Sequence, residues 1–362
     1  MTINSFLLEP IKRLSDHYQV QIIVNGSPEN ISTELHGVKV ESIPIQRKIS
    51  PFLDLIALIR LVKFFRNQDF KVVQSVTPKA GLLAMLASYL ARVNIRIHIF
   101  TGQVWVTRRG LSRWVLKQMD RMIHFLATDI LVDSGSQRQF LLEQRVVNTT
   151  RSSVLANGSI SGVDTSRFKP NARARLDIRR ELDIDEKCIV FLFIGRLNRD
   201  KGVLDLAAAF SNITGDGARL LVVGPDEAGI QSEMESILEN CLERVYFIGY
   251  SSDPEKYMAA SDLLCLPSYR EGFGSVVLEA AATGIPAIGS RIYGVEDAIV
   301  DGQTGFLFEA GNIEELYERM MSSITDVSII SILGENARKR VLEEFTSEIL
   351  ASAWLDYYQA KL

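Results

Sequence analysis

The sequence has only three cysteines among its 362 residues, and no two of them stand at a spacing that binds a metal ion. Cys188, Cys241 and Cys265 each lie in an apolar run, which predicts reduced core residues of a cytoplasmic protein. Asp183 and Asp185 form an Asp-x-Asp pattern, but their place just before an apolar run favours a charged turn over a metal site. We therefore expect no metal cofactor.

Other features that would identify a class of protein are also missing. There is no signal peptide, and the longest apolar stretch, near residues 80–91, is too short to span a bilayer. The sequence contains no Walker motif, no Gly-x-Gly-x-x-Gly fingerprint and no internal repeat. These absences argue against a secreted, membrane-spanning or repeat protein.

Charge is divided unevenly along the chain. Residues 1–170 carry 22 Lys and Arg against 12 Asp and Glu, whereas the remainder carries 18 against 32. A length of 362 residues with 47% apolar content is sufficient for two domains with separate cores. The basic half suits anionic lipid or a lipid diphosphate. Nucleic acid is the alternative partner, but the chain has no recognised nucleic-acid motif.

Apolar runs of strand length alternate with helical segments through the second half of the chain. The expected strands there are residues 188–194, 220–223, 245–248, 263–266 and 287–289. Such alternation predicts an α/β fold with a parallel sheet and right-handed crossovers. The first half alternates in the same way, and its strands over 71–76 and 96–100 end in polar loops where ligands bind in open α/β sheets.

Residues 262–305 carry the chemistry of the second half. The run 263–266 ends in a loop that leads through Gly272 and Gly274 into a helix starting at Ser275. The free amides at that helix start favour an anion such as phosphate. Glu271 and Glu279 flank this point, and a carboxylate beside a phosphate is suited to accept hydrogen bonds from sugar hydroxyls. The loop therefore fits a diphosphate between two sugars, which describes a nucleotide-sugar.

A second loop supplies cations. Gly195, Arg196 and Lys201 follow the expected strand 188–194 and precede a helix. Arg196 can bind phosphate oxygens with its planar guanidinium, and Lys201 adds a point charge. Gly224 follows the next strand, so it is expected at the same edge of the sheet. The alternative is a charged surface loop without a ligand.

These two loops resemble the donor site of the retaining glycosyltransferases of family 4. Glu271 and Glu279 are separated by seven residues, as in the family's Glu-x7-Glu motif, and residues 195–202 resemble its Gly-Arg-x4-Lys-Gly motif. The resemblance covers nearly the whole chain and implies the GT-B fold, with two Rossmann-like domains facing a cleft. It implies an acceptor-binding domain over 1–172, a nucleotide-sugar-binding domain over 173–344, and a C-terminal helix over 345–362 that crosses back to the first domain.

The resemblance also implies roles for individual residues. Glu271 would contact the donor sugar, Glu279 the nucleotide ribose, and Arg196 and Lys201 the diphosphate, which makes Glu271, Arg196 and Lys201 the catalytic candidates. The remaining donor-binding candidates are Gly195, Gly272, Phe273, Gly274, Ser275, Gly224 and Tyr250. In the first domain, the loops after the two strands give the acceptor-binding candidates Thr77, Lys79, Gly102, Gln103 and Trp105.

The chain departs from the family pattern at one informative position. Thr101-Gly102 stands where many relatives carry His-Gly, and His98 is expected in the core, so we assign no side-chain base in the first domain. This suits a front-face mechanism, in which the leaving phosphate takes the acceptor proton and Arg196, Lys201 and the helix amides stabilise its charge. Enzymes of this fold need no metal ion at that point.

The predicted function is transfer of a sugar, above all an N-acetylhexosamine, from a UDP-sugar to a lipid-linked or saccharide acceptor. The branch of the family that it resembles builds bacterial surface polysaccharide, including lipopolysaccharide, on a lipid diphosphate. Two alternatives stay open. A sugar-nucleotide epimerase shares the fold and needs no acceptor, and a non-catalytic protein could bind the nucleotide-sugar alone.

The expected helix over 111–126 combines basic and apolar residues. The basic residues recur about every four positions, and apolar residues lie between them: Arg108, Arg109, Arg113, Lys117 and Arg121, with Leu111, Trp114, Val115, Met119, Met122 and Phe125. One interpretation packs the apolar stripe on the core and leaves the basic face in solvent. The other places the helix on anionic lipid, on the inner face of the plasma membrane.

The first residues are too few for the buried strand and loop with which the family begins. Only residues 1–5 precede the helix expected from Phe6, so the central strand of the first sheet is expected to be missing. Its absence would leave unpaired backbone groups and a gap in the core. Either Met1 is an internal methionine of a longer chain, which we favour, or the chain is truncated.

Overall fold

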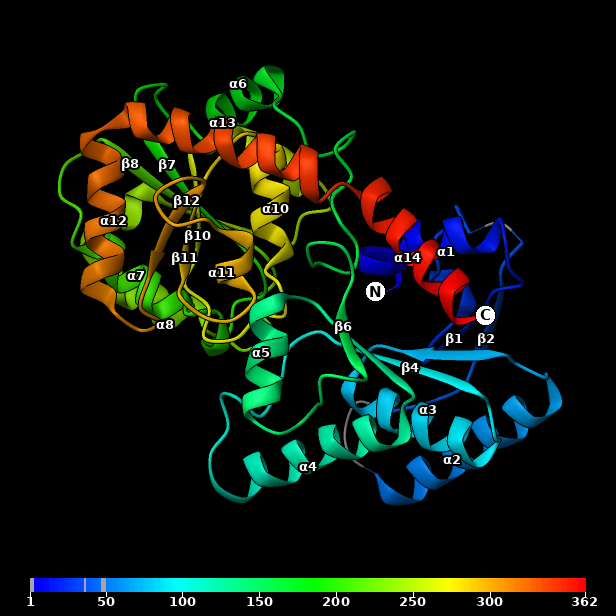
Figure 1. Cartoon of the computed structure of the whole chain (residues 1–362). Helices are drawn as coiled ribbons and strands as arrows, with labels where there is room; N and C mark the ends of the chain where they lie inside the picture. Colours follow the sequence, from blue (N-terminus) through cyan, green and yellow to red (C-terminus); the bar gives the residue numbers. More distant parts are fainter. Residues whose placement is uncertain (1–2, 36, 47–49) are drawn as a thin grey trace. The chain divides into compact units, whose positions relative to one another are not determined.

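The computed structural model describes residues 3–35, 37–46 and 50–362. The chain divides into two compact units, Met1–Gly162 with Ser347–Leu362, here called unit 1, and Val163–Thr346, unit 2 (Figure 1). This division precedes the expected boundary near residue 172. Residues 163–172 belong to unit 2 because the Val163 amide donates to the Phe345 carbonyl at 2.8 Å and Phe168 is buried in that unit's core.

Unit 2 is built on a six-stranded parallel sheet with the order β12-β11-β10-β7-β8-β9. The strands are β7 (Ile189–Ile194), β8 (Ala218–Val223), β9 (Val245–Gly249), β10 (Leu263–Leu266), β11 (Ala287–Ser290) and β12 (Gly305–Phe308). The helices are α6 (Ala172–Glu181), α7 (Val203–Ser211), α8 (Gln231–Ile237), α9 (Pro254–Ala260), α10 (Ser275–Ala282), α11 (Val295–Ala298), α12 (Ile313–Thr325) and α13 (Val327–Glu344). This is the Rossmann-like arrangement that the alternating sequence predicts.

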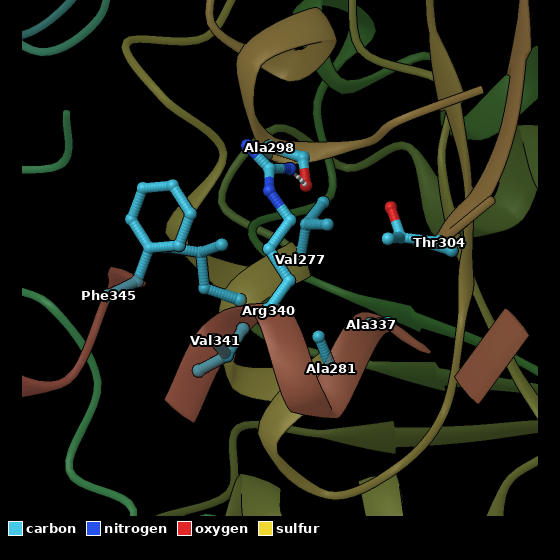
Figure 2. Close-up of a pocket in the computed structure, with 10 residues that line it drawn as sticks. Val277, Ala281, Ala298, Thr304, Ala337, Arg340, Val341 and Phe345 are labelled. Atoms are coloured by element: carbon cyan, nitrogen blue, oxygen red, sulfur yellow. Dashed lines mark hydrogen bonds between the residues drawn. The ribbon is translucent and has the colours of Figure 1, made fainter. Parts of the chain in front are cut away.

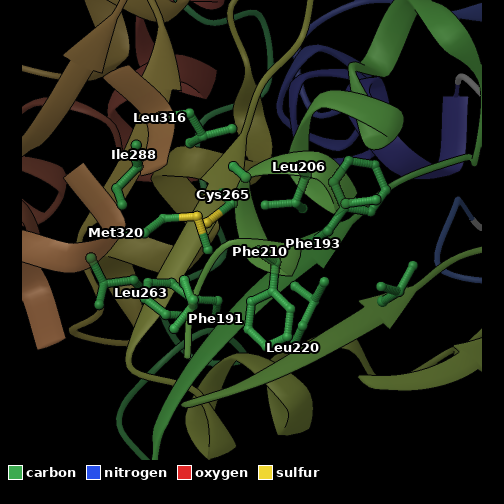
Figure 3. Close-up of a cluster of buried hydrophobic side chains, with 14 of the residues drawn as sticks. Phe191, Phe193, Leu206, Phe210, Leu220, Leu263, Cys265, Ile288, Leu316 and Met320 are labelled. Carbon is green, nitrogen blue, oxygen red and sulfur yellow. The ribbon is translucent and has the colours of Figure 1, made fainter. Parts of the chain in front are cut away.

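The strands of unit 2 are apolar on both faces because helices cover both sides of the sheet. Phe191 and Phe193 of β7 enter one core together with Phe210 of α7 (Figure 3). The alternate residues Val190 and Leu192 enter the other core, against α10 and α13. All three cysteines are free and buried in these cores, as their apolar surroundings predict.

Unit 1 contains two parallel sheets in the part that the structure describes. Four strands pair in the order β3-β4-β5-β6, and β1 pairs with β2. The strands are β1 (Gln21–Val24), β2 (Lys39–Ser42), β3 (Val72–Ser75), β4 (Ile95–Phe100), β5 (Asp129–Val132) and β6 (Ser152–Val154). The helices are α1 (Leu8–Ser15), α2 (Pro51–Asn67), α3 (Pro78–Leu90), α4 (Gly110–Leu126), α5 (Gly135–Glu143) and, from the C-terminus, α14 (Ser347–Lys361). Among the described helices of the whole chain, none has the length and apolar content to cross a bilayer.

The division of unit 1 into two sheets agrees with the expected lack of a central strand. Residues Ile3–Leu7 form a π-helical turn that continues into α1, so the described chain has no strand before β1. In the described ladders β1 pairs with β2 and β3 with β4, and the opposite edges of β1 and β3 have no strand partner there. Met1 and Thr2 lie outside the described residues.

Helices α5 and α6, like the short α11, had no counterpart among the elements expected from the sequence. Helices α5 and α6 are rich in polar residues and lack a clear apolar stripe, so hydrophobic periodicity does not reveal them. Each begins instead at a capping side chain. Ser134 Oγ accepts the Gln137 amide at 3.1 Å, and Asn171 Oδ1 accepts the Ala174 amide at 3.0 Å.

Helix α14 completes the core of unit 1. Trp354 is fully buried among Ile97, Ile99 and neighbouring residues, and its indole Nε1 donates to the Ile160 carbonyl at 2.9 Å. Tyr358 donates its hydroxyl to Gln74 Oε1 of β3 at 2.7 Å. Helix α14 therefore packs on one face of the four-stranded sheet.

Replacing Trp354 with Ala should destabilise the protein by about 3–5 kcal/mol, because a buried aromatic ring and its packing are lost. Trp354→Phe should cost less, since a ring remains. Thermal unfolding measured by calorimetry gives the shift. Trp114→Ala, at a residue that is 61% exposed, is the control and should leave the melting temperature unchanged. Equal melting temperatures for Trp354→Ala and the control would contradict the proposed role of α14.

Candidate active site

Four loops gather at the carboxyl edge of the sheet in unit 2, because all six strands are parallel. They follow β7, β8, β10 and β11. The backbones of these loops touch where glycine allows it. A Cβ on Gly202, which has a φ of +65°, would lie 1.9 Å from the Pro267 carbonyl oxygen. A Cβ on Gly224 would lie 1.8 Å from the Gly195 carbonyl oxygen. Only glycine permits these approaches, so the residues that the sequence identified do bring the loops together.

Lys201 and Glu271, from the loops after β7 and β10, form an ion pair at this edge. Lys201 Nζ lies 2.5 Å from Glu271 Oε1, and Ser268 Oγ donates to the same oxygen at 2.6 Å. Asn198 accepts the Lys201 amide at 3.1 Å and so fixes the short turn that carries the lysine. The side chains of the pair are only 23% and 12% exposed. A cation and a carboxylate predicted from separate motifs thus meet in one place.

Arg196 does not join this pair. Its guanidinium Nη1 lies 3.3 Å from Glu227 Oε2 on the loop after β8, and both side chains are 55% exposed. An exposed ion pair of this kind contributes little to stability, so the guanidinium can exchange its partner at small cost. Tyr250, at the end of β9, is 77% exposed.

The loop after β10 leads into the N-terminus of α10. Gly274 occupies the N-cap position with a φ of +79°, and no side-chain cap is found there in the described chain. The Val277 amide already donates to the Gly274 carbonyl at 2.8 Å, which leaves the amides of Ser275 and Val276 as the helix-start donors. An anion placed there would accept hydrogen bonds from both and be favoured by the helix dipole.

Phe273 has a different role from its neighbours in this loop. Its side chain is 4% exposed and lies with its ring centroid 5.5 Å from that of Phe345. The ring anchors the loop to the core. The expectation that the Phe273 side chain binds a ligand is therefore corrected, because the ring packs in the core.

Glu279 lies in the second turn of α10. Burial raises the pKa of this carboxyl to about 7, while Arg167 lowers it and Glu255 raises it further. Arg167 is held in turn by Glu255 at 2.9 Å and by the Ser252 carbonyl at 2.7 Å. A carboxyl group whose pKa lies near 7 changes its charge around neutral pH. It accepts more hydrogen bonds when it is ionised.

Helix α10 is supported from behind by α13. Figure 2 shows the small apolar cavity between them, lined by Val277, Ala281, Ala337 and Val341. Arg340 crosses this region and donates to the carbonyls of Ala298 at 3.1 Å and Asp297 at 2.9 Å, at the end of α11. The cavity is a small packing defect between α10 and α13. The hydrogen bonds of Arg340 link α13 to α11.

The loop after β11 was not identified from the sequence as part of the candidate active site. A Cβ on Gly294 would lie 2.2 Å from the Gly272 carbonyl oxygen, so this loop rests directly on the Glu271 loop. Ser290, the last residue of β11, is buried. The sequence does show Gly294 shortly after a buried strand. Its contact with Gly272 could not be predicted, because that contact depends on β11 lying next to β10.

Two acceptor-binding candidates of unit 1 are buried. Trp105 is 1% exposed, stacks on Phe140 with centroids 5.5 Å apart, and donates its indole N–H to Asp120 Oδ2 at 2.7 Å. This corrects the expectation that Trp105 contacts an acceptor, since its side chain is a core residue. Gln103 is also 1% exposed, and its Oε1 accepts from Gln137 at 3.2 Å.

The other unit 1 candidates stay predictions. Thr77 is exposed at the N-cap of α3, and Gly102 follows β4 with a φ of +111°. Lys79 pairs with Asp54 at 2.6 Å and donates to the Gln46 carbonyl at 2.8 Å. His98 is a core residue, as expected. It is 1% exposed, its Nδ1 lies 2.7 Å from Ser75 Oγ, and burial lowers its pKa to about 3.

Comparison with known proteins identifies the family of the chain. Residues 3–158 match the family described as Glycosyl transferase 4-like domain, and residues 174–340 match Glycosyl transferases group 1. The capsular polysaccharide biosynthesis glycosyltransferase CapM of Staphylococcus aureus is 31% identical over 311 residues, which cover 85% of this chain and 81% of CapM. The UDP-Gal:alpha-D-GlcNAc-diphosphoundecaprenol alpha-1,3-galactosyltransferase of Escherichia coli is 27% identical and covers 83% and 78%.

Solved structures match the fold of the whole chain. Anabaena Alr3699/HepE in complex with UDP and glucose aligns with a TM-score of 0.80 at 20% identity, covering 98% of this chain and 95% of that one. The family matches, the CapM identity and the paired loops of unit 2 lead to one conclusion: the chain belongs to the family 4 glycosyltransferases, which have the GT-B fold.

Proposed function

We propose that the protein is a retaining glycosyltransferase that moves a sugar from a UDP-sugar to a saccharide carried on a lipid diphosphate. The observation that carries this proposal is the Lys201–Glu271 pair, 2.5 Å apart, which joins the loop after β7 to the loop that leads into the N-terminus of α10. It combines a cation, backbone amides and a carboxylate, which suit a diphosphate joined to a sugar. The UDP bound to HepE and the diphosphoundecaprenol in the name of the E. coli relative support the donor and acceptor classes.

The donor sugar we propose is an N-acetylhexosamine, with glucose and galactose as the alternatives. HepE binds glucose, and the name of the E. coli relative specifies UDP-galactose. A thermal-shift screen against the corresponding UDP-sugars decides among them, because a ligand that binds only the folded protein raises its stability.

The proposed reaction proceeds on one face of the donor sugar. The bond from the acceptor oxygen to the anomeric carbon forms on the side from which the UDP phosphate leaves, and the acceptor proton passes to that phosphate. Lys201, Arg196 and the amides at the start of α10 stabilise the negative charge that develops on it. Glu271 accepts hydrogen bonds from the donor sugar. Because these groups supply the positive charge, we propose that the reaction needs no metal ion, and a chelator should leave the rate unchanged.

Glu271→Ala should abolish sugar transfer and leave UDP affinity nearly unchanged, since the carboxylate is assigned to the sugar. Arg196→Ala and Lys201→Ala should each lower kcat by about 10²–10³-fold, as expected for a lost charge-stabilising group. Steady-state kinetics and calorimetric UDP binding measure the two effects. Glu314→Ala, at an exposed glutamate of α12, is the control. Near-normal turnover by Glu271→Ala would rule out this assignment.

The affinity for UDP should increase between pH 6 and pH 8. The pKa of Glu279 is raised to about 7, so the carboxyl is mostly protonated below that pH and gains acceptor capacity above it. Calorimetric Kd values for wild type and Glu279→Gln separate this effect from titration of UDP itself, because both proteins share the ligand. Parallel pH profiles for the two proteins would show that Glu279 does not contact the nucleotide.

We also propose that unit 1 binds an anionic membrane surface, where a lipid-linked acceptor resides. Of the six apolar residues noted on α4, five are exposed and Met119 is half-buried, so the interpretation that packs this stripe on the core is wrong. Leu111, Trp114 and Phe125 are 75%, 61% and 66% exposed. Ile123 and Leu126 face the core instead.

Helix α2 extends this surface. Phe52, Leu55 and Ile59 lie on one of its faces and are 73%, 53% and 48% exposed. Both α2 and α4 pack against α3. The exposed cations in these helices and just before α4 are suited to anionic headgroups. They are Arg60, Lys63, Arg66, Arg108, Arg109 and Arg113.

Trp114 reports this binding directly, because the other two tryptophans, Trp105 and Trp354, are buried. Vesicles containing phosphatidylglycerol should shift the tryptophan emission to shorter wavelength, and phosphatidylcholine vesicles or high salt should not. Trp114→Phe should sediment with the anionic vesicles but show no shift. Arg109→Glu with Arg113→Glu should abolish sedimentation. Equal sedimentation of the charge-reversed and wild-type proteins would refute the proposal.

A further inference from the structure

A buried polar cluster lies at the carboxyl edge of the four-stranded sheet of unit 1. Its members are Gln103, Asp133, Ser134, Gln137 and Ser159, and none of them is more than 5% exposed. Gln103 lies in the loop after β4, Asp133 directly follows β5, and Ser159 lies in the loop after β6. Three neighbouring strands therefore place polar residues at the edge where parallel sheets bind ligands.

Hydrogen bonds to Gln137 of α5 and to Ser159 fix this cluster. Gln137 Nε2 donates to Gln103 Oε1 at 3.2 Å, and its Oε1 accepts the Asp133 amide at 2.8 Å. The Asp133 carbonyl accepts the Ser159 amide at 2.7 Å. The backbone of Asp133 is thus held on both sides, by a helix and by the loop after β6.

One oxygen of the Asp133 carboxyl group has no hydrogen-bond partner in the part of the chain that the structure describes. Its Oδ1 is buried and has no hydrogen-bond partner within the described residues, although buried polar groups normally have one. Burial raises the pKa of Asp133 to about 8, and no charged neighbour contributes to the shift. At pH 7 the group is mostly neutral, so it can both donate and accept a hydrogen bond.

The loop attached to Asp133 through Ser159 is strained. Ala156 and Ser159 have φ values of +45° and +63°, which residues other than glycine rarely adopt. Such conformations cost free energy and are concentrated near ligand sites, where the surrounding structure enforces them. Asn157, between the two, is exposed. The strained residues lie at the same edge as the unpaired carboxyl oxygen.

We propose that the Asp133 carboxyl hydrogen-bonds a hydroxyl group of the acceptor saccharide and so aligns the acceptor for transfer. A hydroxyl fits because it both donates and accepts, as a neutral carboxyl does. A phosphate only accepts, and it would repel the carboxyl once ionised. The inference rests on the proposed function and deepens it, because it names a group in unit 1 that contacts the acceptor.

The test uses the whole 362-residue chain in the presence of UDP. It measures the binding of a probe in which N-acetylglucosamine is joined through a diphosphate to a short polyprenyl chain. Asp133→Ala should weaken this binding on the order of tenfold, as for loss of a buried hydrogen bond, while the Kd for UDP stays unchanged. Asp133→Asn, whose amide also donates and accepts, should bind nearly as wild type does. Wild-type affinity should fall above pH 8 as the carboxyl loses its proton, and the affinity of Asp133→Asn should not.

Ser134→Ala is the matched control, because it removes the N-cap of α5 beside Asp133 and leaves the carboxyl in place. An equal loss of binding in Ser134→Ala and Asp133→Ala would mean a structural role and overturn the inference. Unchanged binding in Asp133→Ala, or no binding of the probe by wild type, would overturn it as well. Binding that depends on Asp133 without transfer from any UDP-sugar would contradict the proposed function and support the acceptor contact.

Discussion

The donor site depends on close contact between the loops after β7 and β10. Beyond the approach of Gly202 to Pro267, the Tyr269 amide donates to the Asp200 carbonyl at 2.9 Å, and the Tyr269 hydroxyl donates to Asp205 at 2.6 Å. These bonds join residues from different loops, next to the Lys201–Glu271 pair. The pair is therefore held before any ligand binds, and preorganised charges of this kind stabilise a transition state without the cost of reorientation.

The sequence was sufficient to place Lys201 and Glu271 at the same edge of the sheet, because each belongs to a local pattern. Lys201 and Glu271 each follow a buried apolar run and precede a helix, and parallel strands place such loops at one edge. Two local predictions therefore bring together residues that are distant along the chain. The contact of Gly294 with Gly272 was not predictable in this way, because it depends on which strands are neighbours.

The side chains of unit 1 that face the core were harder to predict, because their identity depends on how each helix is rotated about its axis. Trp105 is in the core, where Asp120 of α4 accepts its N–H, and the sequence does not show that these residues face each other. The same rotation places Ile123 and Leu126 inward and Trp114 outward. The apolar residues of α4 outnumber those that one stripe can bury, so the sequence could not tell which of them face solvent.

Arg196 and Lys201, the two cations of the proposed donor site, already have carboxylate partners. A donor phosphate would have to compete with these partners or share the cations with them. Arg196 and Glu227 are both 55% exposed, so water and a phosphate compete easily for the guanidinium. Lys201 is more buried, but an ammonium has three donors, so it can bind a phosphate oxygen while it keeps Glu271. In the donor complex that we propose, one exposed side chain would change partner and the inner pair would stay intact. The carboxylate assigned to the donor sugar then stays in position from donor binding through transfer.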